Sequence, residues 1–188
     1  MPAPKNKLYF IAVVPPSPLS EELVALKQYF QEHYRSKAAL NSPPHITLHM
    51  PFEWKEDKEA VLVTKIKRFT STRNRFNIKL ENFGCFKPRV IYISLIQPVE
   101  LENLHNELHH FCKTKLNLYN ARYKDLPFHP HLTLAFRDLR KSEFHKAWEE
   151  FKAKPFSAEM AVNKLALLKH DGHRWEVLHE LNLAGSEN

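Results

Sequence analysis

Two short segments of the chain carry a histidine and a threonine two residues apart in the same apolar setting. They read PHITL and PHLTL, and their polar residues are His45 and Thr47 in the first copy and His131 and Thr133 in the second. Alternate side chains of a β-strand share a face, so each histidine lies beside its threonine while the aliphatic residues face the other way. One such segment is a weak signal, but two matched copies predict a single site assembled from two strands.

Two imidazoles that face each other across a cleft can serve as a general acid and a general base, because an unperturbed histidine titrates near pH 6.5. Such a pair suits cleavage of a phosphodiester, since one imidazole can deprotonate the attacking water or hydroxyl while the other protonates the departing ribose oxygen. Each threonine hydroxyl can donate a hydrogen bond to a non-bridging phosphate oxygen, where negative charge must be stabilised. The alternative is structural: both histidines could be core residues bonded across a sheet, with threonine present for its strand propensity.

The same residues carry a family resemblance. PHITL and PHLTL, in a chain of 188 residues, resemble the motifs of the 2H phosphoesterase superfamily, and within it those of the 2′,3′-cyclic phosphodiesterase and 2′-5′ RNA ligase branch. The resemblance implies catalysis without a metal or other cofactor by His45, Thr47, His131 and Thr133, in a water-filled cleft between two lobes. It also implies that His45 protonates the leaving oxygen and that His131 activates water.

Five other residues are candidates for substrate binding. Tyr92 and Arg89 belong to a segment that resembles the strand whose aromatic residue shapes the base pocket of relatives, so Tyr92 could stack on a nucleobase and Arg89 could meet a phosphate. Phe10 is similarly placed on the first expected strand. His49 and His129 extend the two motif faces by two residues and are expected at the edge of the cleft. The plain alternative for each is a core, strand or surface residue.

The remaining basic residues of interest are interpreted as surface residues. Relatives often carry a basic residue directly after the second motif, whereas Arg137 stands one position later, and an odd displacement along a strand reverses the side chain. His105 and His109 are one helical turn apart and adjoin His110, a spacing that can bind a metal. No third ligand is placed beside them, so we interpret these histidines as a solvated helix face. A metal-dependent hydrolase built on them is an alternative.

Strands and helices alternate along the chain. Apolar runs and alternation predict strands at 8–14, 45–50, 76–83, 90–96, 131–136, 164–169 and 174–183, with Pro51 ending the second and Gly84 permitting a turn or bulge after the third. Apolar stripes at helical spacing predict helices at 18–30, 55–69, 98–116 and 142–151. This order predicts an α+β, bilobal fold in which two pseudo-symmetric lobes of mixed or antiparallel sheet carry helices outside and enclose a central cleft. We expect a single domain over residues 1–188.

Composition limits the class of protein. An apolar content of 43% is enough to bury one core. The net charge of +7 favours an anionic partner such as phosphate or RNA, although a solvated basic surface gives the same count. Only two cysteines occur, without a Cys-x-x-Cys motif, which favours a reducing compartment. The apolar run at 8–14 lacks a cleavage site and is too short to span a membrane, so we expect a soluble, cytoplasmic protein without membrane contact.

These observations lead to one preferred function. We expect a metal-independent phosphodiesterase that opens 2′,3′-cyclic phosphates on RNA ends or nucleotides to give a 2′-phosphate, and that could also join 2′-5′ ends. The alternative is a non-catalytic RNA- or nucleotide-binding module that uses the same basic cleft. We expect no cofactor and no obligate protein partner, and therefore a monomer whose partner is the RNA or nucleotide itself.

Overall fold

The fold is built around one antiparallel sheet. The computed structural model describes residues 5–96, 98–119 and 127–185. In those ranges the strands are β1 (Asn6–Val13), β2 (Ile46–Lys55), β3 (Phe76–Phe86), β4 (Val90–Ile96), β5 (His131–Ala135), β6 (Ser157–Val162), β7 (Lys164–His170) and β8 (Trp175–Asn182). The α-helices are α1 (Leu19–Tyr34), α2 (Glu59–Thr70), α3 (Val99–Leu116) and α4 (Lys141–Phe151), and short 3-10 turns span Ala38–Asn41 and Glu56–Lys58. The strands follow one another in the order β6-β3-β4-β5-β2-β1-β7-β8.

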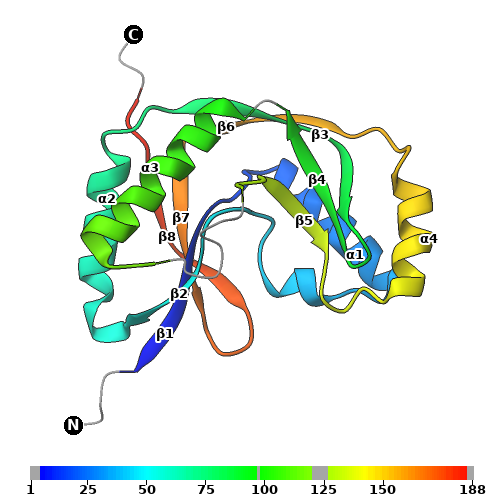
Figure 1. Ribbon diagram of the computed structural model, residues 1–188, viewed down its shortest axis with the longest axis horizontal. Coiled ribbons are helices and arrows are strands. Elements are labelled where there is room, and N and C mark those ends of the chain that lie inside the picture. The colour runs from blue at the N-terminus through cyan, green and yellow to red at the C-terminus, as the bar shows by residue number, and fades with distance from the viewer. Residues whose placement is uncertain (1–4, 97, 120–126, 186–188) are drawn as a thin grey trace.

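This strand order is symmetric about the contact between β5 and β2. The first lobe, as we call it, holds β2, β1, β7 and β8 with α2 and α3, and the second lobe holds β5, β4, β3 and β6 with α1 and α4. Figure 1 shows the two helix pairs at opposite ends of the curved sheet. The expected α+β, bilobal architecture is confirmed. Neither lobe is one stretch of chain, because α1 and α3 each leave a strand of one lobe to cover the other.

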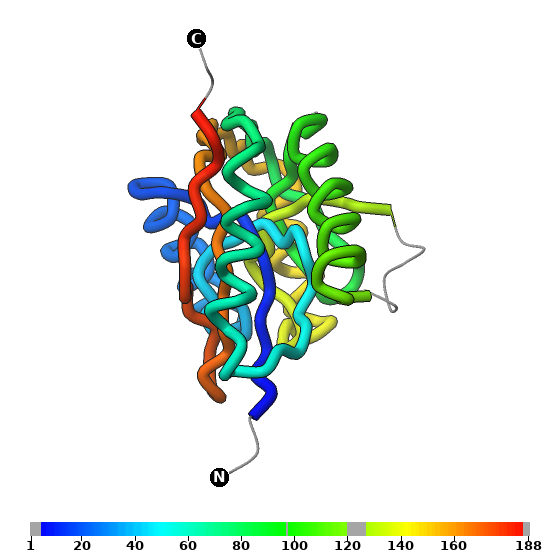
Figure 2. The backbone as a smooth tube through the Cα atoms, turned by 90° about the vertical axis from the view of Figure 1, so that its left-hand side faces the viewer, coloured from blue at the N-terminus to red at the C-terminus, as the bar shows by residue number. Residues whose placement is uncertain are grey.

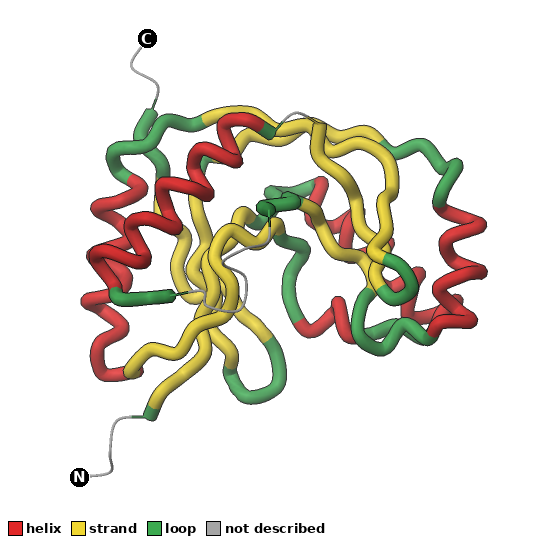
Figure 3. The backbone as a smooth tube through the Cα atoms, viewed as in Figure 1, coloured by secondary structure: helices red, strands yellow, loops and turns green. Residues whose placement is uncertain are grey.

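The two lobes meet through a very short pairing. Ile46 of β2 lies opposite Leu132 of β5, and both side chains are fully buried. On either side of this pair the strands diverge, β2 to pair with β1 and β5 to pair with β4. Figure 3 shows the strands as a continuous band between the helices, so the join lies at the middle of the molecule.

Helices bury their apolar stripes against the sheet, and α1 and α3 lie on opposite sides of the strands in the view of Figure 2. The buried face of α3 carries Leu101, Leu104, Leu108, Cys112 and Leu116, which confirms the stripe predicted for it. On the other face of β1 and β7, a smaller cluster of Phe10, Ala12, Ala166 and Leu168 packs with Trp175. Both cysteines are free thiols. Within the described ranges, no helix combines the length and apolarity needed to cross a membrane.

Strand β2 differs from its prediction because it contains two irregularities. It runs through Pro51 to Lys55, and the proline falls where the register against β1 shifts, so its missing N–H costs no ladder bond. A second shift places Ala12 opposite Thr47 but Ile11 opposite His49, which inserts one extra residue in β2. Strand β6 has no counterpart among the predicted strands, since its polar residues show only weak alternation.

The extra residue in β2 turns His49 into the core. The side chain is 1% exposed, its Nδ1 bonds to the carbonyl oxygen of Met50 at 3.0 Å, and its Nε2 is buried without a hydrogen-bond partner. The ring lies 5.3 Å from that of Phe52 and 5.6 Å from that of His109. Burial lowers the pKa of His49 to about 4. The expectation that His49 lines the cleft edge is therefore wrong, because strand alternation does not survive a bulge.

We predict that His49 makes the protein acid-sensitive. The unfolded chain binds a proton on this imidazole near pH 6.5, whereas the folded protein resists protonation down to about pH 4. Stability is therefore lost as pH falls from about 6.5 toward 4, and His49 alone should lower the free energy of unfolding by about 2 kcal/mol between pH 7 and pH 5. Urea unfolding at pH 7 and pH 5 should show that His49→Leu loses less free energy of unfolding between these pH values than the wild type does. The exposed His145→Leu is the matched control, and an equal pH dependence in all three proteins would contradict the prediction.

Gly84 is required by a close approach between β3 and β4. It lies opposite Tyr92, and a Cβ built at Gly84 would stand 2.4 Å from Cε2 of the tyrosine ring. The bulge expected at Gly84 falls instead between Glu81 and Phe83, at Asn82, whose φ is 57°. Asn82 thus supplies the bulge, and Gly84 supplies the space for a ring.

We predict that Gly84→Ala destabilises the protein by about 1–3 kcal/mol, because the added methyl group must displace Tyr92 or the strand that carries it. Gly185→Ala is the matched control, since its Cβ would meet no atom within 4 Å. Thermal or urea unfolding measures both. Equal stability of the two variants would show that the ring moves aside without cost.

Candidate active site

The four motif residues gather where the lobes meet. Continuing the antiparallel register of Ile46 and Leu132 by one residue in each direction places His45 opposite Thr133 and Thr47 opposite His131. All four side chains point to the face opposite the buried aliphatic pair, and all four are half-buried. Each histidine therefore has two threonine neighbours, one on its own strand and one across the join.

The two imidazoles are diagonal neighbours across this join. Diagonal positions on antiparallel strands are about 7–8 Å apart at Cα, too far for direct hydrogen bonding between rings but close enough to flank one phosphate. Their electrostatic proximity is evident, because the charge of His131 contributes to lowering the pKa of His45. Diagonal placement of this kind puts both imidazoles on one face of the sheet, on opposite sides of the join.

Both imidazoles are held in the same way. Nδ1 of His45 lies 2.8 Å from the carbonyl oxygen of Pro43, and Nδ1 of His131 lies 2.7 Å from that of His129. A carbonyl oxygen can only accept, so each Nδ1 carries the proton and donates it. Each Nε2 is then free to accept a proton, or to donate one once the ring is charged. The local backbone thus fixes the ring orientation and the tautomer at both positions.

Burial keeps both histidines neutral in the unliganded protein. Desolvation lowers the pKa of His45 to about 4, and the positive charges of Lys27 and His131 act in the same direction. Desolvation also lowers the pKa of His131, opposed in part by the hydrogen bond from its Nδ1 to the carbonyl oxygen of His129, which raises it. A phosphate anion between the rings would favour an imidazolium and oppose this effect. Binding of an anion and uptake of a proton are therefore coupled at this site.

Aromatic rings back both histidines. Phe10 of β1 lies 4.9 Å from the His45 ring at 48°, and Tyr92 of β4 lies 5.0 Å from the His131 ring at 54°. Phe10 is 3% exposed and Tyr92 is 6% exposed. Neither ring presents a free face to a nucleobase, so the structure does not place them as the stacking residues that the sequence suggested. Phe10 packs against His45 in the first lobe in the same way that Tyr92 packs against His131 in the second.

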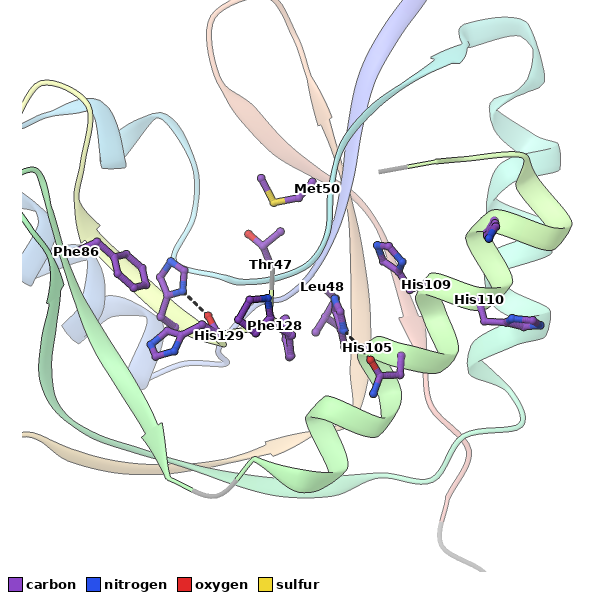
Figure 4. Close-up of a pocket in the computed structure, with 13 residues that line it drawn as sticks. Thr47, Leu48, Met50, Phe86, His105, His109, His110, Phe128 and His129 are labelled. Atoms are coloured by element: carbon purple, nitrogen blue, oxygen red, sulfur yellow. Dashed lines mark hydrogen bonds between the residues drawn. The ribbon is translucent and has the colours of Figure 1, made fainter. Parts of the chain in front are cut away.

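A hollow of about 730 Å³ opens from Thr47 and His131 toward α3, while His45 and Thr133 lie outside its lining. Figure 4 shows Phe86 and His129 on one side, Thr47 and Met50 in the middle, and the histidines of α3 on the other side. The α3 residues that line the hollow are His105, Asn106, His109, His110 and Lys113. The interpretation of these histidines as a solvated face is therefore wrong, because the helix crosses in front of β2 and turns that face to the cleft.

Phe86 is the aromatic residue that presents an open surface to this cleft. Its side chain is 41% exposed, and its ring meets the His131 ring edge-on at 5.1 Å and 87°. His129 lies 5.3 Å from the same ring and hydrogen-bonds through Nε2 with the Tyr92 hydroxyl at 3.2 Å. His129 thus lines the cleft as expected. The sequence offered a signal for Phe86, an apolar ring at the end of a strand just before a turn, which we did not single out.

Two arginines lie away from the catalytic pair. Arg89 follows the turn between β3 and β4, and it lines a second hollow together with Arg137 rather than the main cleft. Arg137 is exposed, as expected, and its guanidinium lies 5.1 Å from the centre of the Phe136 ring. The structure therefore separates Arg89 from the residues with which the sequence grouped it.

Lys27 is a buried cation that the sequence interpretation missed. It is 2% exposed, and its Nζ donates to the carbonyl oxygens of Ala39 at 2.9 Å and Ser42 at 3.1 Å. Burial lowers its pKa to about 8. These bonds anchor the segment that leads into Pro43 and His45. Its position four residues after Leu23, on the apolar stripe of α1, was the available signal.

Metal ligation is not indicated by the described residues, where no group of three or more His, Cys, Asp or Glu side chains is arranged to hold an ion. The rings of His105 and His109 are 5.3 Å apart and tilted by 31°. His105 instead stacks flat on Phe128, with ring centres 3.7 Å apart and planes 7° apart. This contact covers one face of the His105 imidazole at the wall of the cleft.

Known proteins resemble this chain in sequence and in architecture. A protein of Geobacillus kaustophilus that carries the name phosphoesterase (GK0864) is 28% identical over 182 residues, which are 95% of this chain and 98% of that protein. A similarly named protein of Bacillus mycoides is 26% identical over 181 residues, covering 95% and 97%. The structure of E. coli LigT complexed with NADP+ is 25% identical with a TM-score of 0.68, over 96% of this chain and 99% of that chain.

Two further comparisons concern the fold and the family. TT0787 of Thermus thermophilus has a TM-score of 0.67 at 24% identity, over 96% of this chain and 99% of that chain, a likeness of fold. A family model described as the 2′-5′ RNA ligase superfamily matches residues 15–174. This match contains both His-x-Thr segments and every strand from β2 to β7. The chain belongs to the 2′-5′ RNA ligase superfamily, which confirms the resemblance to 2H phosphoesterases.

Proposed function

We propose that this protein is a 2′,3′-cyclic phosphodiesterase that acts on RNA ends or nucleotides and leaves a 2′-phosphate. The observation that carries the proposal is the pair of His-x-Thr segments joined at Ile46 and Leu132. Both Nδ1 atoms are bound by carbonyl oxygens, and no hydrogen bond engages either Nε2 among the described residues. A relative, E. coli LigT, has been crystallised in complexes with 3′-AMP and with phosphate. These ligands are the kinds of group that the proposed site would hold.

The reaction needs one proton removed and one proton supplied. Water attacks phosphorus in line with the bond to the ribose O3′, and one histidine takes the water proton on Nε2 as the new P–O bond forms. The P–O3′ bond breaks, and the other histidine gives its Nε2 proton to O3′. The products are a 3′-hydroxyl and a 2′-phosphate. Return of a proton between the two imidazoles through solvent restores the starting state.

The threonines complete the site electrostatically. As phosphorus becomes five-coordinate, negative charge grows on its non-bridging oxygens, and hydroxyl donors held on strands are already oriented toward it. The register of Ile46 and Leu132, continued by one residue, would set Thr47 across from His131 and Thr133 across from His45. Each hydroxyl therefore accompanies both the histidine of its own strand and that of the other lobe. The same steps with an RNA 5′-hydroxyl in place of water would form a P–O5′ bond as the P–O3′ bond breaks, which gives a 2′-5′ linkage and a 3′-hydroxyl.

The assignment of acid and base rests on two opposed arguments. The family resemblance implies that His45 is the acid, whereas the depressed pKa of His45 in the unliganded protein favours its neutral, basic form. The two rings influence each other, so their titration belongs to the pair. A bound phosphate anion next to His45 would stabilise its imidazolium, and we therefore keep His45 as the acid and His131 as the base.

We predict that His45→Ala and His131→Ala each lower kcat/KM for 2′,3′-cyclic UMP by at least about 100-fold, the usual contribution of general acid or base catalysis. Initial rates in excess chelator measure the effect. His145→Ala is the matched control, because His145 is an exposed histidine on α4 outside the lining of the cleft, and its rate should stay within about threefold of wild type.

Three outcomes would count against the proposal. Loss of less than about tenfold in either motif variant is too small for general acid–base catalysis. Binding of the cyclic nucleotide without turnover would identify a binding module. Abolition of wild-type activity by chelator, with His105→Ala as damaging as His45→Ala, would identify a metal-dependent hydrolase.

We predict that a substrate with a better leaving group shows which histidine is the acid and which is the base. A nucleoside 4-nitrophenyl phosphodiester expels a stable phenolate, so it needs a base but little help from an acid. The loss caused by His45→Ala should shrink at least about tenfold on this substrate relative to the cyclic nucleotide, whereas the loss caused by His131→Ala should persist. The measurement is kcat/KM of the wild type and of both variants on each substrate. The reverse pattern would exchange the two roles.

A further inference from the structure

A second hollow, separate from the catalytic cleft, is lined almost entirely by cations. It has a volume of about 460 Å³ and lies where the end of α1, the turn after β3 and the segment after β5 come together. Its cationic side chains are Arg35, Lys37, Arg89, Arg137, Arg140 and Lys141. All six are exposed to solvent. We call this the basic hollow.

The charge of the basic hollow is not balanced by its own carboxylate. Asp138 is the acidic residue among its lining, and its carboxylate accepts bonds from the Ser36 hydroxyl at 2.9 Å and from the backbone N–H groups of Lys37 at 2.9 Å and Ala38 at 3.0 Å. Among the described residues, no ion pair involves any of the six cations. Elsewhere on the surface cations do pair, as Arg73 does with Glu107.

This concentration of charge has an energetic cost. Six cations and one carboxylate give a local charge of +5, most of the +7 carried by the whole chain. Like charges held in a concave surface repel, and a concave surface also focuses the field and raises the local concentration of anions. Four of the cations are arginines, whose planar guanidinium groups bind phosphate oxygens in pairs. The chemistry of the hollow matches phosphate.

The strands of the catalytic site lead directly to the basic hollow. Arg137 lies four residues after Thr133 and two residues beyond the end of β5, so at most about 13 Å of chain separates them. Arg89 precedes Tyr92 by three residues, and Tyr92 pairs with Thr133 across β4 and β5. Figure 1 shows the end of β5 close to the turn between β3 and β4, beside α1 and α4. A separation of this order lies within the span of a short oligonucleotide.

We infer that the basic hollow binds backbone phosphates of a single-stranded RNA whose 3′ end occupies the catalytic cleft. The inference rests on the proposed function for the position of that end. It makes an RNA strand, rather than a free cyclic nucleotide, the preferred substrate. Contacts to phosphate carry no base identity, so the hollow adds affinity and direction without sequence preference.

The test is the triple variant Arg35→Gln, Arg137→Gln, Arg140→Gln. Its kcat/KM for a short oligouridylate with a 2′,3′-cyclic phosphate, divided by its kcat/KM for 2′,3′-cyclic UMP, should fall about tenfold relative to wild type. The slope of log affinity against log salt for the oligouridylate should become shallower by about 2, since each lost phosphate contact removes about 0.7. The charge-matched control is Lys58→Gln, Lys67→Gln, Arg68→Gln on and before α2, which should change neither quantity.

Binding of an uncleaved oligouridylate with a 3′-phosphate separates this inference from the proposed function. If wild type cleaves neither substrate but the triple variant alone loses salt-dependent RNA binding, the basic hollow stands and the cyclic phosphodiesterase fails. If the ratio of kcat/KM and the salt slope are the same in wild type, triple variant and control, the inference is overturned. If inorganic phosphate binds in the basic hollow of the wild type but the oligouridylate does not compete with it, the inference is also overturned.

Discussion

The pairing of Ile46 with Leu132 is the constraint on which the rest of the structure depends. It is the point at which two four-stranded halves become one sheet, and it places two His-x-Thr segments side by side in opposite directions. Because the pair is buried on one face, a slip of one residue would expose both aliphatic side chains and bury both histidines. The hydrophobic effect therefore fixes the register of the two His-x-Thr segments, and the geometry of the polar face follows from the packing of the apolar one.

Much of this arrangement could be predicted from the sequence because its signals are local. Alternation around Ile46 and Leu132 assigned faces to the motif residues, and the stripe of α3 assigned its buried side. Three features could not be predicted from such signals. The bulge in β2 reverses His49 through its pairing with β1, Gly84 is dictated by a ring on another strand, and α3 covers the opposite lobe from the strand it follows. Each depends on a neighbour that is distant in sequence.

Exposure explains the differences among the candidate binding residues. Residue type and strand position make Phe10 and Tyr92 candidates for stacking, yet each ring is covered by its neighbours and supports a histidine. Phe86 stands at the end of β3, across the β3–β4 turn from Tyr92. No further strand covers its side chain there, and 41% of it remains exposed. Residue type identifies which side chains can stack, but tertiary packing decides which of them is accessible.

Charge is divided between two regions with different physical requirements. Proton transfer needs imidazoles that change charge easily, and partial burial beside Lys27 keeps the unliganded pair neutral and responsive to an anion. Attraction of an anionic polymer needs permanent charge in water, where desolvation does not penalise it, and arginines in the basic hollow provide that charge. Placing those arginines against the histidines would lower the histidine pKa values further and oppose protonation of the acid. Under the proposed function, separation along β5 would let the second lobe attract phosphate strongly without opposing protonation of the histidines, a reason that follows from electrostatics alone.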